Sequence, residues 1–165
     1  MKKYIFIVNG MARCGKDTFA EILGKMVPTM KYSSISKVKG IATLCGWDGS
    51  KTEKDRKFLS DLKCLTTEYN DMAFTSISKK VESFRDNHIH KILLIDIREP
   101  SEIERARRVF DAKAILIINN RVENITSNMA DANVYNYTYD YVIENNGTLD
   151  EFRENIKEFV DELEF

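Results

Sequence analysis

Short apolar runs alternate along the chain with segments whose apolar residues recur every three or four positions. Runs of this kind, bounded by polar or turn-forming residues, predict β-strands. The predicted strands are Tyr4–Val8, Lys31–Ile35, Lys91–Ile97, Lys113–Ile118 and Tyr139–Glu144. Lys91–Ile97 is almost entirely apolar, which favours a parallel sheet that is buried on both faces.

The segments between these strands have the spacing of amphipathic helices. Ser36 is a candidate helix N-cap, and three further Ser or Thr residues begin capping-box patterns. These patterns are Thr52–Asp55, Ser101–Glu104 and Thr148–Glu151. Alternating strands and helices over 165 residues predict a single α/β domain, with helices on both faces of a parallel sheet.

The loop after the first strand runs Gly10-Met11-Ala12-Arg13-Cys14-Gly15-Lys16 and leads directly into a helix. A strand, a Gly-x-x-x-x-Gly-Lys loop and a helix in succession form the phosphate-binding P-loop. Its glycines let backbone N–H groups turn around an anion, and the positive end of the helix faces the same anion. Lys16 can then reach the β- and γ-phosphates of ATP. The predicted nucleotide-binding residues of this segment are Gly10, Arg13, Cys14, Gly15, Lys16, Asp17 and Thr18.

Asp17 occupies the position at which the general motif has a Ser or Thr that holds Mg²⁺. An acid beside a triphosphate is repelled unless a cation intervenes, so we expect Asp17 to approach Mg²⁺ or to pair with a nearby Arg. Thr18 is the remaining hydroxyl for the metal or a phosphate. The Gly-Lys-x-Thr ending resembles the nucleoside monophosphate kinases, and Gly-Lys-Asp-Thr resembles the phage-type deoxynucleoside monophosphate kinases and their bacterial relatives. The resemblance implies a three-layer P-loop fold with five parallel strands in the order 2-3-1-4-5.

Asp96 lies near the carboxyl end of a predicted strand, where ligands bind in parallel α/β sheets. An acid at this place, beside a P-loop, can orient Mg²⁺ or its water. Arg98 points the same way as Asp96 if the strand continues that far. The segment Asp96–Pro100 resembles the Asp-Val-Arg segment of the deoxynucleoside monophosphate kinases, which implies that Arg98 contacts an acceptor or a transferring phosphoryl group. The alternative is an Asp96–Arg98 ion pair that only closes the end of the strand.

Residues 32–74 form an insert between the P-loop helix and the next long strand, and in nucleotide kinases such an insert carries the acceptor. Ser34 offers a hydroxyl to the acceptor, and Arg56 offers a partner for its phosphate. The helix that begins after Thr52 has an apolar stripe that includes Phe58 and Leu65. The basic residues of the insert also fit a solvated helix surface without a binding role.

Arg121 follows the fourth strand, at the place where adenylate kinase-like enzymes begin a lid and set an Arg against the nucleotide base. The resemblance therefore implies a lid over residues 121–137. Full lids supply several arginines, but residues 122–137 contain no further Arg or Lys. We therefore expect a short lid, with phosphate clamping moved to Arg98 and Arg13.

The composition limits the kinds of partner that the protein is expected to bind. The net charge is −1, from 25 basic and 26 acidic residues, so nucleic acid is not predicted as the main partner. No apolar run approaches the roughly 20 residues that span a bilayer, and the N-terminal run is too short for a signal peptide. The three cysteines lack metal-ligand or disulfide spacing. These features predict a cytoplasmic protein, and they leave its oligomeric state open.

The predicted function is the transfer of a phosphoryl group from ATP to a nucleoside or deoxynucleoside monophosphate, with Mg²⁺ as cofactor. Lys16, Arg98 and Asp96 are the predicted catalytic residues, and Asp17, Thr18 and Asp96 the candidate metal ligands. Two alternatives remain. One is a kinase for another small phosphorylated metabolite, and the other is a P-loop module that binds ATP without catalysis.

Overall fold

The computed structural model describes residues 2–122 and 134–165. Five parallel strands form one sheet in the order β2-β3-β1-β4-β5. The strands are β1 (Tyr4–Asn9), β2 (Thr29–Ser33), β3 (Ile92–Asp96), β4 (Lys113–Ile118) and β5 (Tyr141–Glu144). The predicted fold class and strand order are confirmed. Strand β2 begins and ends two residues earlier than the sequence pattern suggested.

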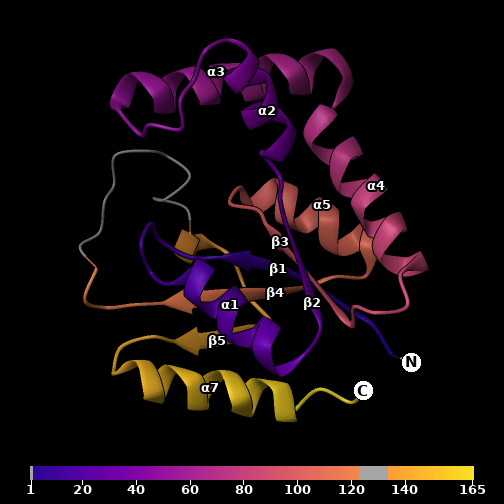
Figure 1. The fold of residues 1–165 in the computed structure, drawn as a ribbon, viewed down its shortest axis with the longest axis vertical. Coiled ribbons are helices and arrows are strands. Elements are labelled where there is room, and N and C mark those ends of the chain that lie inside the picture. Colours follow the sequence, from indigo (N-terminus) through magenta and orange to yellow (C-terminus); the bar gives the residue numbers. More distant parts are fainter. Residues whose placement is uncertain (1, 123–133) are drawn as a thin grey trace.

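Helices cover both faces of this sheet (Figure 1). The helices of the described residues are α1 (Lys16–Met26), α2 (Ser36–Leu44), α3 (Glu53–Asn70), α4 (Met72–Asp86), α5 (Pro100–Phe110) and α7 (Leu149–Asp161), with a 3-10 turn at Val134–Asn136. Helices α1 and α7 pack on one face, and α4 and α5 pack on the other. Within the described ranges, no helix has the length and apolar character needed to cross a membrane.

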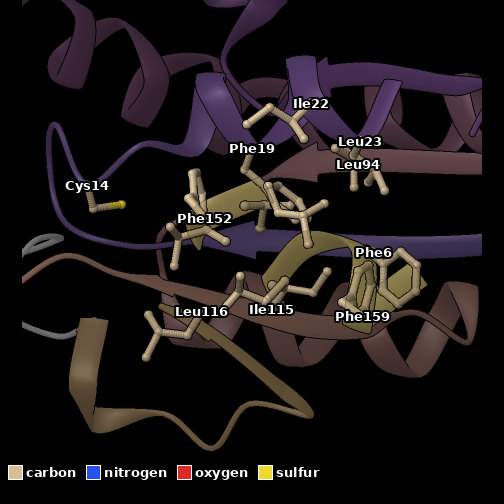
Figure 2. Close-up of a cluster of buried hydrophobic side chains, with 14 of the residues drawn as sticks. Phe6, Cys14, Phe19, Ile22, Leu23, Leu94, Ile115, Leu116, Phe152 and Phe159 are labelled. Atoms are coloured by element: carbon tan, nitrogen blue, oxygen red, sulfur yellow. The ribbon is translucent and has the colours of Figure 1, made fainter. Parts of the chain in front are cut away.

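The core is split by the sheet into two apolar clusters, because successive side chains of a strand point to opposite faces. Phe6 and Val8 of β1 face α1 and α7, where they pack with Phe19 and Phe152 (Figure 2). Ile5 and Ile7 of the same strand join the cluster beneath α4 and α5. Burial on both faces explains why the strand sequences are nearly continuous runs of apolar residues.

The helix starts agree only in part with the capping patterns. The Thr52–Asp55 and Thr148–Glu151 capping boxes are both present. The Ser101–Glu104 pattern is wrong as a cap, because α5 begins one residue earlier with Pro100 at its first position. Proline is favoured there since its fixed φ suits a helix and its missing N–H is not needed. Ser36 is likewise the first helical residue of α2, and its N-cap is Ile35.

Helices α2 and α3 form an arm that extends away from the sheet (Figure 1). None of the 18 residues of α3 is buried, so its predicted apolar stripe does not become core. Phe58, Leu65 and Tyr69 are exposed along the helix. Helix α2 attaches the arm through the buried side chains of Val38 and Ala42. Helix α3 adds an ion pair of 2.8 Å between Lys63 Nζ and Glu102 Oε1 of α5.

Candidate active site

The P-loop connects the carboxyl end of β1 to the first residue of α1, and its glycines are required by the packing around them. Gly10 has φ 149°, in the region that favours glycine. A Cβ atom at Gly10 would lie 2.6 Å from both Cys14 Sγ and the Ile117 carbonyl oxygen. The buried Asn9 side chain accepts a hydrogen bond of 2.8 Å from the Gly10 N–H, which fixes the first peptide of the loop.

Lys16 is the first residue of α1, and its side chain turns back over the loop. Its Nζ donates to the carbonyl oxygens of Gly10 at 2.6 Å and Met11 at 2.7 Å. The helix N-cap is Gly15, which makes no side-chain capping bond. Amide groups at the start of α1 are therefore not capped by that residue and can bind an anion, with the ammonium of Lys16 beside them.

Asn145 supports the P-loop from the turn that follows β5. Its side-chain nitrogen donates to the Cys14 carbonyl oxygen at 3.0 Å, and a Cβ on Gly15 would lie 2.5 Å from that nitrogen. The Cys14 thiol is buried, and this burial raises its pKa despite the proximity of Lys16. Cys14 is thus a packed loop residue. The sequence pattern identified Asn145 only as part of a turn, because its contact is 131 residues away in the chain.

Asp17 and Asp96 converge on one lysine that the sequence pattern did not single out. Lys31 Nζ of β2 forms a close hydrogen bond with Asp17 Oδ1 and lies 3.4 Å from Asp96 Oδ2. Asp17 therefore pairs with a lysine, whereas an arginine had been predicted as its protein partner. The hydrogen bond from Lys31 lowers the pKa of Asp17, while burial raises the pKa of Asp96.

Strand register explains why Lys31 reaches these carboxylates. Ser33 of β2 is the register partner of Asp96, and Lys31 lies two residues earlier on the same face of the sheet. A sequence analysis that placed β2 beside β3 in this register would have found the contact.

The ion pairs that Lys31 forms with Asp17 and Asp96 do not include the candidate arginines or Thr18. Strand β3 ends at Asp96, so the condition for Arg98 to point the same way is not met. Arg98 is exposed, and its carbonyl oxygen accepts a hydrogen bond of 3.2 Å from the Asn9 side chain. Arg13 is also exposed and has a positive φ of 63°. Thr18 is half-buried and lines a shallow hollow between α1 and α7, on a different side of α1 from the Asp17–Lys31 contact.

The predicted acceptor residues and the predicted lid residue Arg121 make contacts in three different parts of the structure. Ser34 is buried, and its N–H donates to the Asp96 carbonyl oxygen at 3.1 Å. Arg56 lies on the arm, where its Nε donates to the Lys51 carbonyl oxygen at 3.3 Å. Arg121 donates to the Asn145 carbonyl oxygen at 3.2 Å, beside the turn that supports the P-loop. Most of the predicted lid, residues 123–133, lies outside the described residues.

The donor chemistry fits Mg²⁺. Oxygen ligands are the ones this ion prefers, and it keeps several waters or phosphate oxygens beside one or two carboxylates. Asp17 and Asp96 already hold a cation between them in the form of the Lys31 ammonium. No group of three or more His, Cys, Asp or Glu side chains gathers as a metal site within residues 2–122 and 134–165. A metal here would therefore need further ligands from water or from nucleotide.

Comparisons with known proteins identify the fold. No protein-family profile and no curated protein matches the sequence. Among solved structures, a dephospho-CoA kinase from Campylobacter jejuni is 17% identical with a TM-score of 0.54, and the match covers 97% of each chain. A sugar kinase from a Janibacter species is 12% identical with a TM-score of 0.57, covering 98% of this chain and 95% of that one. The chain has the P-loop kinase fold. A shikimate kinase from Aquifex aeolicus, 10% identical with a TM-score of 0.52, shares this P-loop kinase fold over 95% of this chain and 96% of its own.

Proposed function

We propose that the protein transfers the terminal phosphoryl group of ATP to a nucleoside or deoxynucleoside monophosphate. The observation that carries the proposal is the position of Lys16, at the end of the glycine-bounded loop and the start of α1, where its charge acts on Asp96 at the end of the neighbouring strand β3. The fold supports phosphoryl transfer. The choice of acceptor rests on the resemblance of the Gly-Lys-Asp-Thr and Asp-Ile-Arg segments to the deoxynucleoside monophosphate kinases.

The chain's own residues supply positioning and charge neutralisation, which is most of what phosphoryl transfer requires. The amides from Gly10 to Lys16 bind the phosphates, and Lys16 exchanges its two loop carbonyls for phosphate oxygens. Arg98 and Arg13 neutralise charge that develops during transfer. Bound Mg²⁺ would neutralise phosphate charge, and Asp17 and Asp96 would hold it. A monophosphate acceptor is already anionic at neutral pH, so the reaction needs no general base.

A second candidate is a kinase whose acceptor reacts through a hydroxyl group. The similar structures are named for acceptors as different as dephospho-CoA, a sugar and shikimate, so the fold alone does not choose. A hydroxyl acceptor benefits from a general base, and Asp96 has a pKa raised by burial. A fall in turnover at low pH that disappears in Asp96→Asn with an otherwise active enzyme would favour this candidate.

The test is ADP release from Mg-ATP across a panel of ribo- and deoxynucleoside monophosphates, with other phosphorylated metabolites as a second panel. Lys16→Ala should reduce acceptor-dependent turnover by about 100-fold or more, because the loss of the phosphate-binding charge removes transition-state stabilisation. Lys25→Ala is the matched control, since Lys25 lies on the same helix and its ion pair is with exposed Glu21. Tight ATP binding with no acceptor-dependent turnover in either panel would contradict the kinase proposal and leave a nucleotide-binding module.

A further inference from the structure

Three separate elements meet at the Lys31 ammonium. Lys31 comes from the edge strand β2, Asp17 from the first turn of α1, and Asp96 from the end of β3. The Asp17 side chain is 97% exposed, but that of Asp96 is only 25% exposed and that of Lys31 34%. The ammonium is thus a partly enclosed cation between two carboxylates, one of which, Asp17, directly follows the P-loop lysine in the chain.

Two carboxylates that converge on one point repel each other unless a cation lies between them. In this protein that cation is part of the chain. A divalent ion placed between the same oxygens would be repelled by the ammonium, so both cannot occupy the position together. Lysine suits an exchange of this kind, because its charge is compact and its four-carbon stem is flexible.

We propose that Lys31 is an internal counter-ion of the metal site, which blocks the binding of a divalent cation to Asp17 and Asp96 until nucleotide is present. This inference rests on the proposed function, because it assumes that the P-loop binds a nucleotide triphosphate. The phosphates add the metal ligands that the two carboxylates lack. The divalent cation and the nucleotide together displace the Lys31 ammonium. Metal and nucleotide binding are therefore coupled through Lys31, and each increases the affinity for the other.

The decisive experiment is a titration of the nucleotide-free protein with Mn²⁺, followed by electron paramagnetic resonance. Lys31→Met should bind Mn²⁺ at least about tenfold more tightly than the unmodified protein, because the competing positive charge is gone. Lys25→Met, which removes the same charge from the far end of α1, should leave the affinity unchanged. The gain should disappear when Asp17→Asn is combined with Lys31→Met. Equal Mn²⁺ affinity in the unmodified protein and Lys31→Met would overturn the proposal.

Two further measurements keep the test independent of folding and of catalysis. If Lys31→Met does not fold, Lys31→Gln gives the same comparison with a neutral side chain of similar length. In the unmodified protein, Mg²⁺ with a non-hydrolysable ATP analogue should increase the labelling of Lys31 by an amine reagent, and the labelling of Lys25 should not change. Unchanged Lys31 labelling would contradict displacement. Failure of the proposed function would instead appear as absent acceptor-dependent ADP release, with the Mn²⁺ titration unaffected.

Discussion

The P-loop end of the sheet and the α2–α3 arm are built in opposite ways. The P-loop is held by its neighbours: buried Asn9 accepts from the Gly10 N–H, half-buried Asn145 donates to the Cys14 carbonyl oxygen, and Cys14 is packed into the core. Helix α3 buries no side chain and leaves Leu65 64% exposed. The conformation of the P-loop is fixed by its contacts, whereas α3 presents apolar and basic side chains with few protein partners among the described residues.

This difference in packing matches the two tasks of the proposed reaction, which are phosphate binding and acceptor binding. Phosphate binding requires backbone amides held in one geometry, and the neighbours of the P-loop restrict its backbone accordingly. An arm that binds an acceptor must admit and release a second ligand, and weakly packed segments open at low free-energy cost. The contrast leads to the following predictions about substitutions in each region.

The largest effect is expected for Gly10→Ala. The new Cβ would lie 2.6 Å from the Ile117 carbonyl oxygen, at a φ that non-glycine residues rarely adopt. We expect a loss of about 3 kcal/mol in the free energy of unfolding, measured by urea denaturation, together with loss of ATP binding. The matched change in the arm is Gly40→Ala, where nothing lies within 4 Å of the added Cβ. It should be neutral or stabilise by up to about 1 kcal/mol, because alanine is the better helix former. Equal changes in the free energy of unfolding for the two substitutions would contradict the difference in packing between the P-loop and the arm.

Tyr139 makes the stability of the P-loop end depend on alkaline pH. Its hydroxyl donates to the Val134 carbonyl oxygen at 2.7 Å and accepts from the Asn9 side chain at 2.8 Å, and burial raises its pKa to about 12. An unfolded chain ionises tyrosine near pH 10, so the folded state holds the proton more tightly. This contribution to stability is complete below about pH 10 and is lost as the pH rises toward about 12.

For the half-buried Tyr139 ring, solvent screening leaves a loss on the order of 1–2 kcal/mol. Urea denaturation between pH 9 and 12 should show the decline in the unmodified protein and a shallower one in Tyr139→Phe. Tyr69→Phe, at an exposed position on α3, is the control and should keep the full decline. An identical pH profile for Tyr139→Phe would show that this hydroxyl is not tied to folding.

The same contrast explains what the sequence could predict. The P-loop is a local feature of strand, glycine-bounded loop and helix, so Gly10 to Thr18 were located from the residue pattern alone. The five strands followed from apolar runs, and their order from a family resemblance. Contacts between distant segments could not be predicted, because spacing along the chain does not report them. Lys31 reaches Asp96 through the β2–β3 register and Asp17 through the packing of α1 beside β2, and Asn145 reaches Cys14 across 131 residues.

The apolar stripe of α3 was found from the sequence, but what the stripe faces was not predicted, for a related reason. Its apolar residues recur at helical spacing, which normally identifies a face that packs on a core. In this fold the helix lies on an arm, so the same periodicity produces exposed side chains such as Leu65. Periodicity identifies the face of a helix, but the surface against which that face lies is a tertiary property.

The smallest effect is expected for Leu65→Ala. Its side chain is 64% exposed, so truncation removes little buried area, and we expect a change in the free energy of unfolding within about 0.5 kcal/mol. Leu94→Ala makes the same chemical change at a side chain 1% exposed on β3, and should cost about 3 kcal/mol through the cavity it leaves. Urea denaturation of the two variants compares them directly. A loss above about 1.5 kcal/mol for Leu65→Ala would mean that the arm is packed in solution, since an exposed leucine cannot account for it. A weakly packed arm, in contrast, leaves this apolar face available to whatever the arm binds.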